Sequence, residues 1–178
     1  SLGASVNDIP VGQWGLVTCF SHAPSKHLGA YGSAGTAVTN DDALAQRMER
    51  IVAYGQARAH HYQPGRLASP PLHHLDEGLH EKLDELQAAL LQAKLPNVDE
   101  GIAQRIARAT RYHHNLIHSN MTLPTIRPNY HHTFRNYVVH LAVGTNRERV
   151  QQHLADKGIA TGDRKSTRLN SSHVCSSR

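Results

Sequence analysis

The stretch CFSHAPSKHLGAYG, residues 19–32, determines the fold that we expect for this chain. An apolar run at 16–20 precedes Lys26, and a second run at 36–39 follows it. Both runs are rich in β-branched or aromatic residues and are bounded by glycine, which predicts two short strands. Lys26 is therefore expected on the connection between these strands.

The residues around Lys26 suit a lysine that reacts with an aldehyde. Glycines, a proline and several small residues leave space around an amine and let the backbone approach a flat ligand. A lysine amine becomes a nucleophile only after it loses its proton, which burial or a nearby cation favours. Ser21, at the end of the first strand, could hydrogen-bond a phosphate oxygen. An isolated lysine in such a loop is, however, most often a solvated surface charge.

The order of residues around Lys26 resembles the cofactor-lysine segment of the DegT/DnrJ/StrS family of pyridoxal-phosphate sugar aminotransferases. The matching pattern is F-S-x-x-P-S-K-x-L-G-A-Y-G at 20–32, followed by G-T-A-V-T-N-D-D at 35–42. Further segments resemble the family in the same order along the chain. They are YGQ at 54–56, LDELQAA with KLP within 83–96, YVV at 137–139 and GIATG at 158–162.

The resemblance implies an α/β fold of the fold-type-I, aspartate aminotransferase-like class, present here in truncated form. Residues 1–103 would be the C-terminal part of the large domain that binds pyridoxal 5'-phosphate. Residues 104–162 would be most of the small domain. Family members are more than twice as long, so we expect the aspartate that pairs with the pyridinium nitrogen to lie upstream of Ser1.

The resemblance also implies an activity and roles for two residues. The reaction would be transfer of an amino group, from glutamate, to a nucleotide-linked keto-sugar. Lys26 would be the catalytic residue and would hold the cofactor covalently, while Ser21 would bind the cofactor phosphate. The family builds its site from two subunits, so a homodimer is expected. Because the acidic partner of the ring is missing, we expect this chain alone to be inactive.

Two departures from the family pattern keep other functions open. Ala53 stands where an asparagine that reaches the partner's cofactor phosphate is often found, and Lys82 stands where arginine is usual. A non-catalytic binding or regulatory relative on the same scaffold would tolerate both changes. An aminotransferase for a non-sugar ketone also remains open. A dehydratase of the same superfamily is disfavoured by Lys26, since its pattern has histidine there.

The last sixteen residues, 163–178, lie beyond the segments that resemble the family. They form a polar, serine-rich run without apolar periodicity, and their start resembles the translation of a common sequencing-library adapter. We therefore expect a non-native, disordered tail. It carries Arg164, Lys165, Arg168 and Arg178 against Asp163, so that 15 basic and 13 acidic residues remain of the 19 and 14 in the whole chain.

Once the tail is excluded, basic and acidic residues nearly balance, so the charge does not indicate binding to nucleic acid or to an anionic membrane. No apolar run approaches membrane-spanning length. Cys175 belongs to the tail, which leaves Cys19 as a lone cysteine, expected to be buried. A single thiol without a disulfide framework is typical of a reducing cytoplasm.

The 15 histidines raise the possibility of a metal site. Several occur as adjacent pairs, at 60/61, 73/74, 113/114 and 131/132. Neighbouring side chains on a helix or strand diverge, whereas metal ligands must converge. We therefore expect no metal, and solvated or packing roles for these histidines.

Periodicity predicts the remaining elements. Helices are expected at 40–55, with Asn40 as the N-cap, at 83–96, at 97–116, and at 146–158, with Asn146 as the N-cap. A strand is expected at 136–143 and the start of another after Gly158. Residues 56–80 lack a clear period and contain two proline-rich turns, which predicts a long loop.

Overall fold

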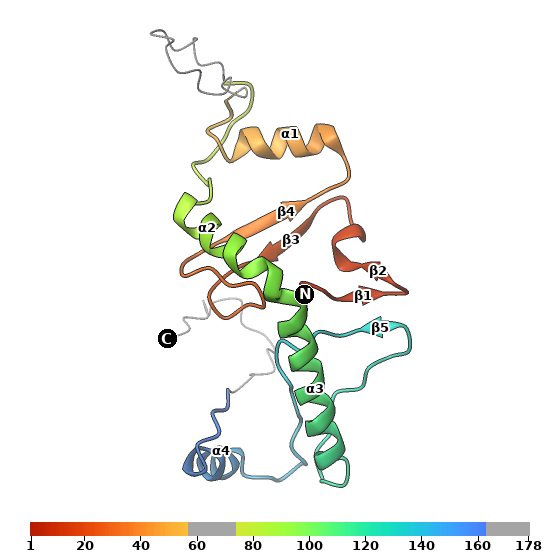
Figure 1. The fold of residues 1–178 in the computed structure, drawn as a ribbon. Helices are drawn as coiled ribbons and strands as arrows, with labels where there is room; N and C mark the ends of the chain where they lie inside the picture. The colour runs from red at the N-terminus through yellow and green to blue at the C-terminus, as the bar shows by residue number, and fades with distance from the viewer. Residues whose placement is uncertain (57–73, 163–178) are drawn as a thin grey trace. The chain divides into compact units, whose positions relative to one another are not determined.

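The computed structural model describes residues 1–56 and 74–162. These residues divide into two compact units, of which the first comprises Ser1–Ser119 with Leu123–Val139 and the second comprises Asn120–Thr122 with the residues from His140 onward. The first unit contains, in order, β1 (Ser5–Val6), β2 (Ile9–Pro10), a 3-10 helix (Val11–Gln13), β3 (Thr18–Ser21), β4 (Gly35–Val38), α1 (Asp42–Ile51), α2 (Glu85–Lys94), a 3-10 helix (Leu95–Asn97), α3 (Val98–Leu116) and β5 (Tyr130–His131). The second unit contains α4 (Arg147–Asp156) (Figure 1).

The two strands predicted around Lys26 form an antiparallel pair. In the register of β3 and β4, Thr18 lies opposite Val38 and Ser21 lies opposite Gly35. The β-branched and aromatic residues of these segments favour this extended pairing. Residues 22–34 therefore form the connection that carries Lys26, as the sequence predicts.

A second small sheet has the strand order β2-β1-β5, with both pairings antiparallel. Asn7 and Asp8 adopt positive φ angles of 50° and 62°, which turn the chain between β1 and β2. Strands of two residues have no detectable alternation of apolar and polar residues, so this sheet could not be predicted from the sequence. It ties the segment after residue 130 to the amino-terminal residues.

The helices begin at capping residues, and one of these differs from the prediction. The N-cap of α1 is Asp41, whose Oδ1 accepts a hydrogen bond from the Leu44 amide at 3.0 Å, so the prediction of Asn40 as the cap is wrong. The Asn40 prediction placed the cap one residue too early because both residue types favour this position. The cap predicted for α4 is confirmed, since Asn146 Oδ1 accepts from the Arg149 amide at 2.9 Å.

The core of the first unit lies between the Lys26 loop and α2. Leu28 and Ala30 of the loop are buried against Leu91 of α2, and partly buried hydrophobic residues surround them. A 3-10 helix joins α2 to α3, on which Ile102 and Ala109 are also buried. Burial of these apolar side chains stabilises the position of the loop. The segment with the expected chemistry is thus also the segment that forms the core.

The predictions of a strand at 136–143 and of a buried Cys19 are also wrong. The strand expected at 136–143 is not formed, and within the described residues only an isolated bridge joins His140 to Thr122. A strand needs a continuous partner to satisfy its backbone groups, and this segment has one only at that position. Cys19 is exposed rather than buried, because β3 has β4 as its only strand partner in the described part of the chain.

Other predictions concern residues that the structure does not describe. The tail at 163–178 and most of the loop at 56–80 lie outside the described residues. Residues 74–80, the described part of that loop, return to the end of α1 through the bridges Gln56–His74 and Ala53–His80. The predicted domain boundary after residue 103 stays a prediction, and α3 crosses it without a break.

The described part of the chain lacks both a membrane-spanning helix and a cluster of metal-binding side chains. Within residues 1–56 and 74–162, no helix is long and apolar enough to cross a bilayer. The same residues contain no group of three histidine, cysteine or acidic side chains placed to hold a metal ion.

Candidate functional site

Lys26 lies on the connection between β3 and β4, and Ser21 is the last residue of β3, directly before that connection. The backbone amide of Lys26 donates to the Ala23 carbonyl at 2.9 Å, which closes a turn through Pro24 and Ser25. Lys26 is half-buried, and its side chain has no hydrogen bond or ion pair with any residue that the structure describes. Ser21 is exposed, and its Oγ accepts only a long contact of 3.5 Å from the Ala23 amide.

A buried histidine closes the base of this loop. His22 is 4% exposed, and its Nδ1 lies 3.0 Å from the Leu28 carbonyl oxygen. Its Nε2 lies 3.0 Å from Oγ1 of Thr36 on β4. The backbone of His22 also donates to Ala34 and accepts from Ala30, both at 2.8 Å. The role of His22 is not evident from the sequence, because a histidine in a loop of small residues has no distinctive pattern.

Helix α2 holds the far side of the loop. Lys94 Nζ donates to the Gly29 carbonyl at 2.7 Å and lies 4.3 Å from the centre of the Tyr31 ring. Gln87 Oε1 accepts from the Tyr31 amide at 2.8 Å. A cation over an aromatic ring and charge-assisted hydrogen bonds are among the stronger polar contacts. These contacts to α2 complement the apolar packing of Leu28 on the same helix.

A third set of contacts comes from the residues after β5. Arg135 donates to Ser25 Oγ at 3.0 Å, and His27 Nε2 lies 3.0 Å from the Thr133 carbonyl oxygen. A carbonyl oxygen can only accept, so Nε2 of His27 carries the proton. Both neighbours of Lys26 in the sequence are therefore fixed from this segment. The sequence did not predict this, because the partners are more than 100 residues apart.

Aromatic contacts hold the same segment against α3. Tyr137 lies 5.4 Å from Tyr112 of α3 and 6.1 Å from Phe134, measured between ring centroids. Burial raises the pKa of Tyr137 above its ordinary value, because the charged phenolate is disfavoured away from water. Burial also lowers the pKa of His132, with the charges of His131 and His27 as smaller causes.

The loop has the groups needed to hold pyridoxal phosphate. A lysine without a carboxylate partner can bond to an aldehyde, and an exposed hydroxyl can donate to a phosphate oxygen. The side chains that hydrogen-bond the loop are supplied by Ser1, Thr36, Gln87, Lys94 and Arg135. None of them is acidic, so these contacts supply no carboxylate for the ring nitrogen. The residues present thus fit the aldehyde and phosphate ends of the cofactor.

The two residues that depart from the family pattern lie at the end of α1 and after the undescribed segment. Ala53 is half-buried and bridges to His80, whose ring stacks on Tyr54 at 4.8 Å between centroids. Lys82 is exposed. Nearby, Asp76 accepts from Arg50 Nε at 2.7 Å. Arg50 holds the pKa of Asp76 below its usual value, chiefly through this hydrogen bond.

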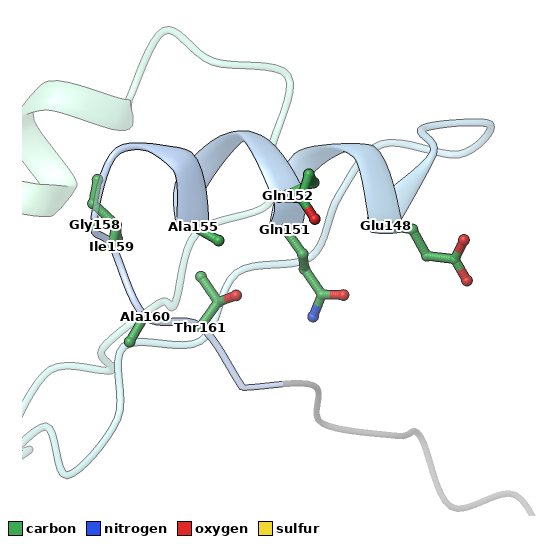
Figure 2. Close-up of a pocket in the computed structure, with 8 residues that line it drawn as sticks. All are labelled: Glu148, Gln151, Gln152, Ala155, Gly158, Ile159, Ala160 and Thr161. Atoms are coloured by element: carbon green, nitrogen blue, oxygen red, sulfur yellow. The ribbon is translucent and has the colours of Figure 1, made fainter.

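The second unit contains a hollow of about 680 Å³. It is lined by residues of α4 and of the segment that follows it: Glu148, Gln151, Gln152, Ala155, Gly158, Ile159, Ala160 and Thr161. Figure 2 shows Gln151 extending from α4 toward the segment that carries Ala160 and Thr161. No lining residue belongs to the Lys26 loop, so this hollow does not identify the expected cofactor site.

Comparison with known proteins gives one family. A model of the DegT/DnrJ/EryC1/StrS aminotransferase family matches residues 1–169. A UDP-2-acetamido-2-deoxy-3-oxo-D-glucuronate aminotransferase of Pseudomonas aeruginosa is 35% identical over 161 residues, which cover 90% of this chain and 41% of the relative. A "pleiotropic regulatory protein" of Geobacillus stearothermophilus is 32% identical over 164 residues, with coverage of 90% and 40%. The chain thus spans about 40% of the length of these relatives.

Solved structures give the same result for the fold. S. venezuelae DesV, determined in complex with a ketimine intermediate, superposes with a TM-score of 0.74 at 29% identity. The match covers 89% of this chain and 39% of DesV. The predicted fold class, a truncated α/β aminotransferase fold of the pyridoxal-phosphate type, is confirmed by this match.

Proposed function

This chain belongs to the DegT/DnrJ/EryC1/StrS aminotransferase family, and from that membership we propose that it is the lysine-bearing part of a transaminase that acts on nucleotide-linked keto-sugars. The cofactor of this family is pyridoxal phosphate. The Pseudomonas aeruginosa relative is named for a UDP-linked oxo-sugar, which supports this substrate class. Glutamate is the amino donor that we propose.

In this proposal, Lys26 and Ser21 hold opposite ends of the cofactor. Lys26 Nζ would hold the aldehyde end of the cofactor, and the Ser21 hydroxyl would donate to a phosphate oxygen. When bound, the cofactor supplies the electron sink for the reaction. Nζ of Lys26 would also be the base that takes and returns the proton of the substrate. The surrounding contacts fix the backbone from which Nζ extends.

One observation supports the role of Lys26 above the others. Its side chain has no partner among the described residues, although its loop is fixed by α2, β4 and the segment after β5. A structural lysine is usually paired or fully solvated. A half-buried, unpaired amine on a fixed backbone is instead available for covalent chemistry, because no other side chain competes for it.

The family relationship supports three further proposals. The protein is a cytoplasmic homodimer, with a site built from two subunits. The 178-residue chain alone is inactive, because none of the groups that contact its loop can pair with the ring nitrogen. The upstream part of the protein supplies an aspartate for that purpose.

The direct test is transamination by the full-length protein, after the coding sequence upstream of Ser1 has been recovered. We expect release of the keto acid from glutamate in the presence of a nucleotide-linked keto-sugar. Lys26→Ala should abolish this release, and the 178-residue chain should show none. Keto-acid release that is unchanged by Lys26→Ala would reject the proposed role of Lys26.

A second candidate is a regulatory or binding protein on the same scaffold. It is favoured by the name of the Geobacillus stearothermophilus relative and by the departures at Ala53 and Lys82. A binding protein would take up the cofactor or the sugar nucleotide without transferring an amino group. Half-transamination with glutamate distinguishes the two, because only the transaminase converts its bound cofactor. Acceptors of the non-sugar ketone class are tested in the same assay.

A further inference from the structure

Both ring nitrogens of the buried His22 side chain have a hydrogen-bond partner. Nδ1 faces the Leu28 carbonyl oxygen, which can only accept, so Nδ1 carries a proton. In the neutral ring Nε2 is then an acceptor, and the Thr36 hydroxyl donates to it. The ring of His22, which directly follows β3, is thus bonded both to Leu28 in the loop and to Thr36 on β4. All of its polar capacity is used at 4% exposure.

These two bonds close the loop around Lys26. Residues 22 and 28 are held together by the ring of His22, and Lys26 lies between them. The segment between residues 22 and 28 also contains the turn in which the Lys26 amide donates to the Ala23 carbonyl. Leu28 cannot move away without breaking both the His22 bond and its own packing on Leu91. The path of the backbone through Lys26 therefore depends on the imidazole of His22.

We propose that His22 is a positioning residue for Lys26. It acts through the Leu28 carbonyl and Thr36 rather than by touching the cofactor, and it fixes the backbone from which Nζ reaches the aldehyde. The inference rests on the proposed function of Lys26. It adds that the two hydrogen bonds of the His22 imidazole are required for fast covalent loading of pyridoxal phosphate, apart from any effect on global stability.

Four variants separate the two hydrogen bonds from the volume of the ring. His22→Phe keeps an aromatic ring and loses both bonds. His22→Asn retains a donor near the position of Nδ1, so it can still reach the Leu28 carbonyl. Thr36→Val keeps the shape of an exposed strand residue and removes only the donor to Nε2, whereas Thr36→Ser keeps the hydroxyl. His153→Asn, on α4, is the control for loss of a histidine elsewhere.

The experiment measures how fast the apo form of the full-length protein is loaded with pyridoxal phosphate at Lys26. Borohydride reduction at timed intervals, followed by peptide mass spectrometry, gives the loaded fraction at that residue. We expect His22→Phe to slow loading by about tenfold or more, the order expected when two ordinary hydrogen bonds are lost. Thr36→Val should slow it less, and His22→Asn should restore part of the rate. Thr36→Ser and His153→Asn should load like the wild type.

The outcomes distinguish this inference from the proposed function. If the wild type loads at Lys26 and folded His22→Phe and Thr36→Val load equally fast, the inference is wrong while the function stands. If the wild type does not load at Lys26, the proposed function fails and the inference falls with it. If His22→Phe does not fold, the loading rates of Thr36→Val and Thr36→Ser are compared instead. Equal rates for these two variants would then reject the inference. The positioning role would also be rejected if the loading rate of each apo variant followed only its melting temperature and His22→Asn restored none of the rate.

Discussion

At the scale of single residues, Ser21 is the side chain whose proposed role is easiest to isolate. It is exposed, and its hydroxyl makes only a long contact within its own turn, so removal should leave the fold intact. A hydrogen bond to a charged group contributes about 1.5–3 kcal/mol. We therefore expect Ser21→Ala to raise the dissociation constant of pyridoxal phosphate by about 10- to 100-fold, measured by absorbance titration. Ser33→Ala, in the same loop, is the matched control, and equal effects of the two would contradict the role of Ser21.

Asp76 provides a prediction of pH dependence. Arg50 lowers the folded-state pKa of Asp76, so the ion pair contributes stability above the carboxylate's unfolded pKa, about 3.9. That contribution is lost as the pH falls through the lower folded value. Asp76→Asn should therefore reduce the melting temperature near neutral pH, and the difference from wild type should shrink below about pH 4. Glu77→Gln, at an exposed neighbouring position, should not show this convergence, and a difference independent of pH would refute the account.

At the scale of elements, the cap of α1 can be tested with two adjacent residues. Asp41 accepts from the Leu44 amide, whereas the sequence favours Asn40 equally. Replacement of an N-cap residue by alanine costs about 1 kcal/mol. We expect Asp41→Ala to lower the free energy of unfolding by about that amount and Asn40→Ala to have little effect, as measured by denaturant titration. A larger loss of unfolding free energy for Asn40→Ala than for Asp41→Ala would show that Asn40 is the N-cap.

Gly29 tests how tightly the Lys26 loop is packed. A Cβ at this position would lie 2.5 Å from the Pro24 carbonyl oxygen and 3.1 Å from that of Ala23, and neither backbone atom can move freely. Overpacking of this kind costs about 1–3 kcal/mol. Gly29→Ala should lower the free energy of unfolding and slow cofactor loading at Lys26.

Gly101 is the matched control for Gly29. It lies within α3, and a Cβ there meets nothing within 4 Å. Gly101→Ala should raise stability by about 0.5–1 kcal/mol through helix propensity, without changing loading. If both alanine variants were equally stable and loaded alike, the loop would not be packed as the structure shows.

The elements also show what local sequence can predict. The strands around Lys26 and the four helices have strong periodicity or caps, and all were predicted close to their observed bounds. The strand expected at 136–143 failed because a strand depends on its partner, which no local pattern encodes. The sheet of β1, β2 and β5 escaped prediction because its strands have only two residues each.

At the scale of the whole molecule, the sequence offers candidate residues for the chemistry but does not show what holds them in place. Lys26 and Ser21 are candidates because of their order along the chain, and that order is local. The partners of their loop, among them Lys94, Arg135 and Thr133, come from distant segments. Such pairs arise from packing, so a single sequence does not show them. The buried role of His22 was missed for the same reason, since Thr36 lies on the opposite strand.

The account depends most directly on the bond between Nζ of Lys26 and pyridoxal phosphate. The decisive measurement is borohydride reduction of the cofactor-loaded full-length protein, followed by peptide mapping of the modified lysine. We predict a single major site, Lys26, with Lys82 and Lys94 unmodified. Modification of another lysine, or of Lys26 no more than these two, would contradict the central claim.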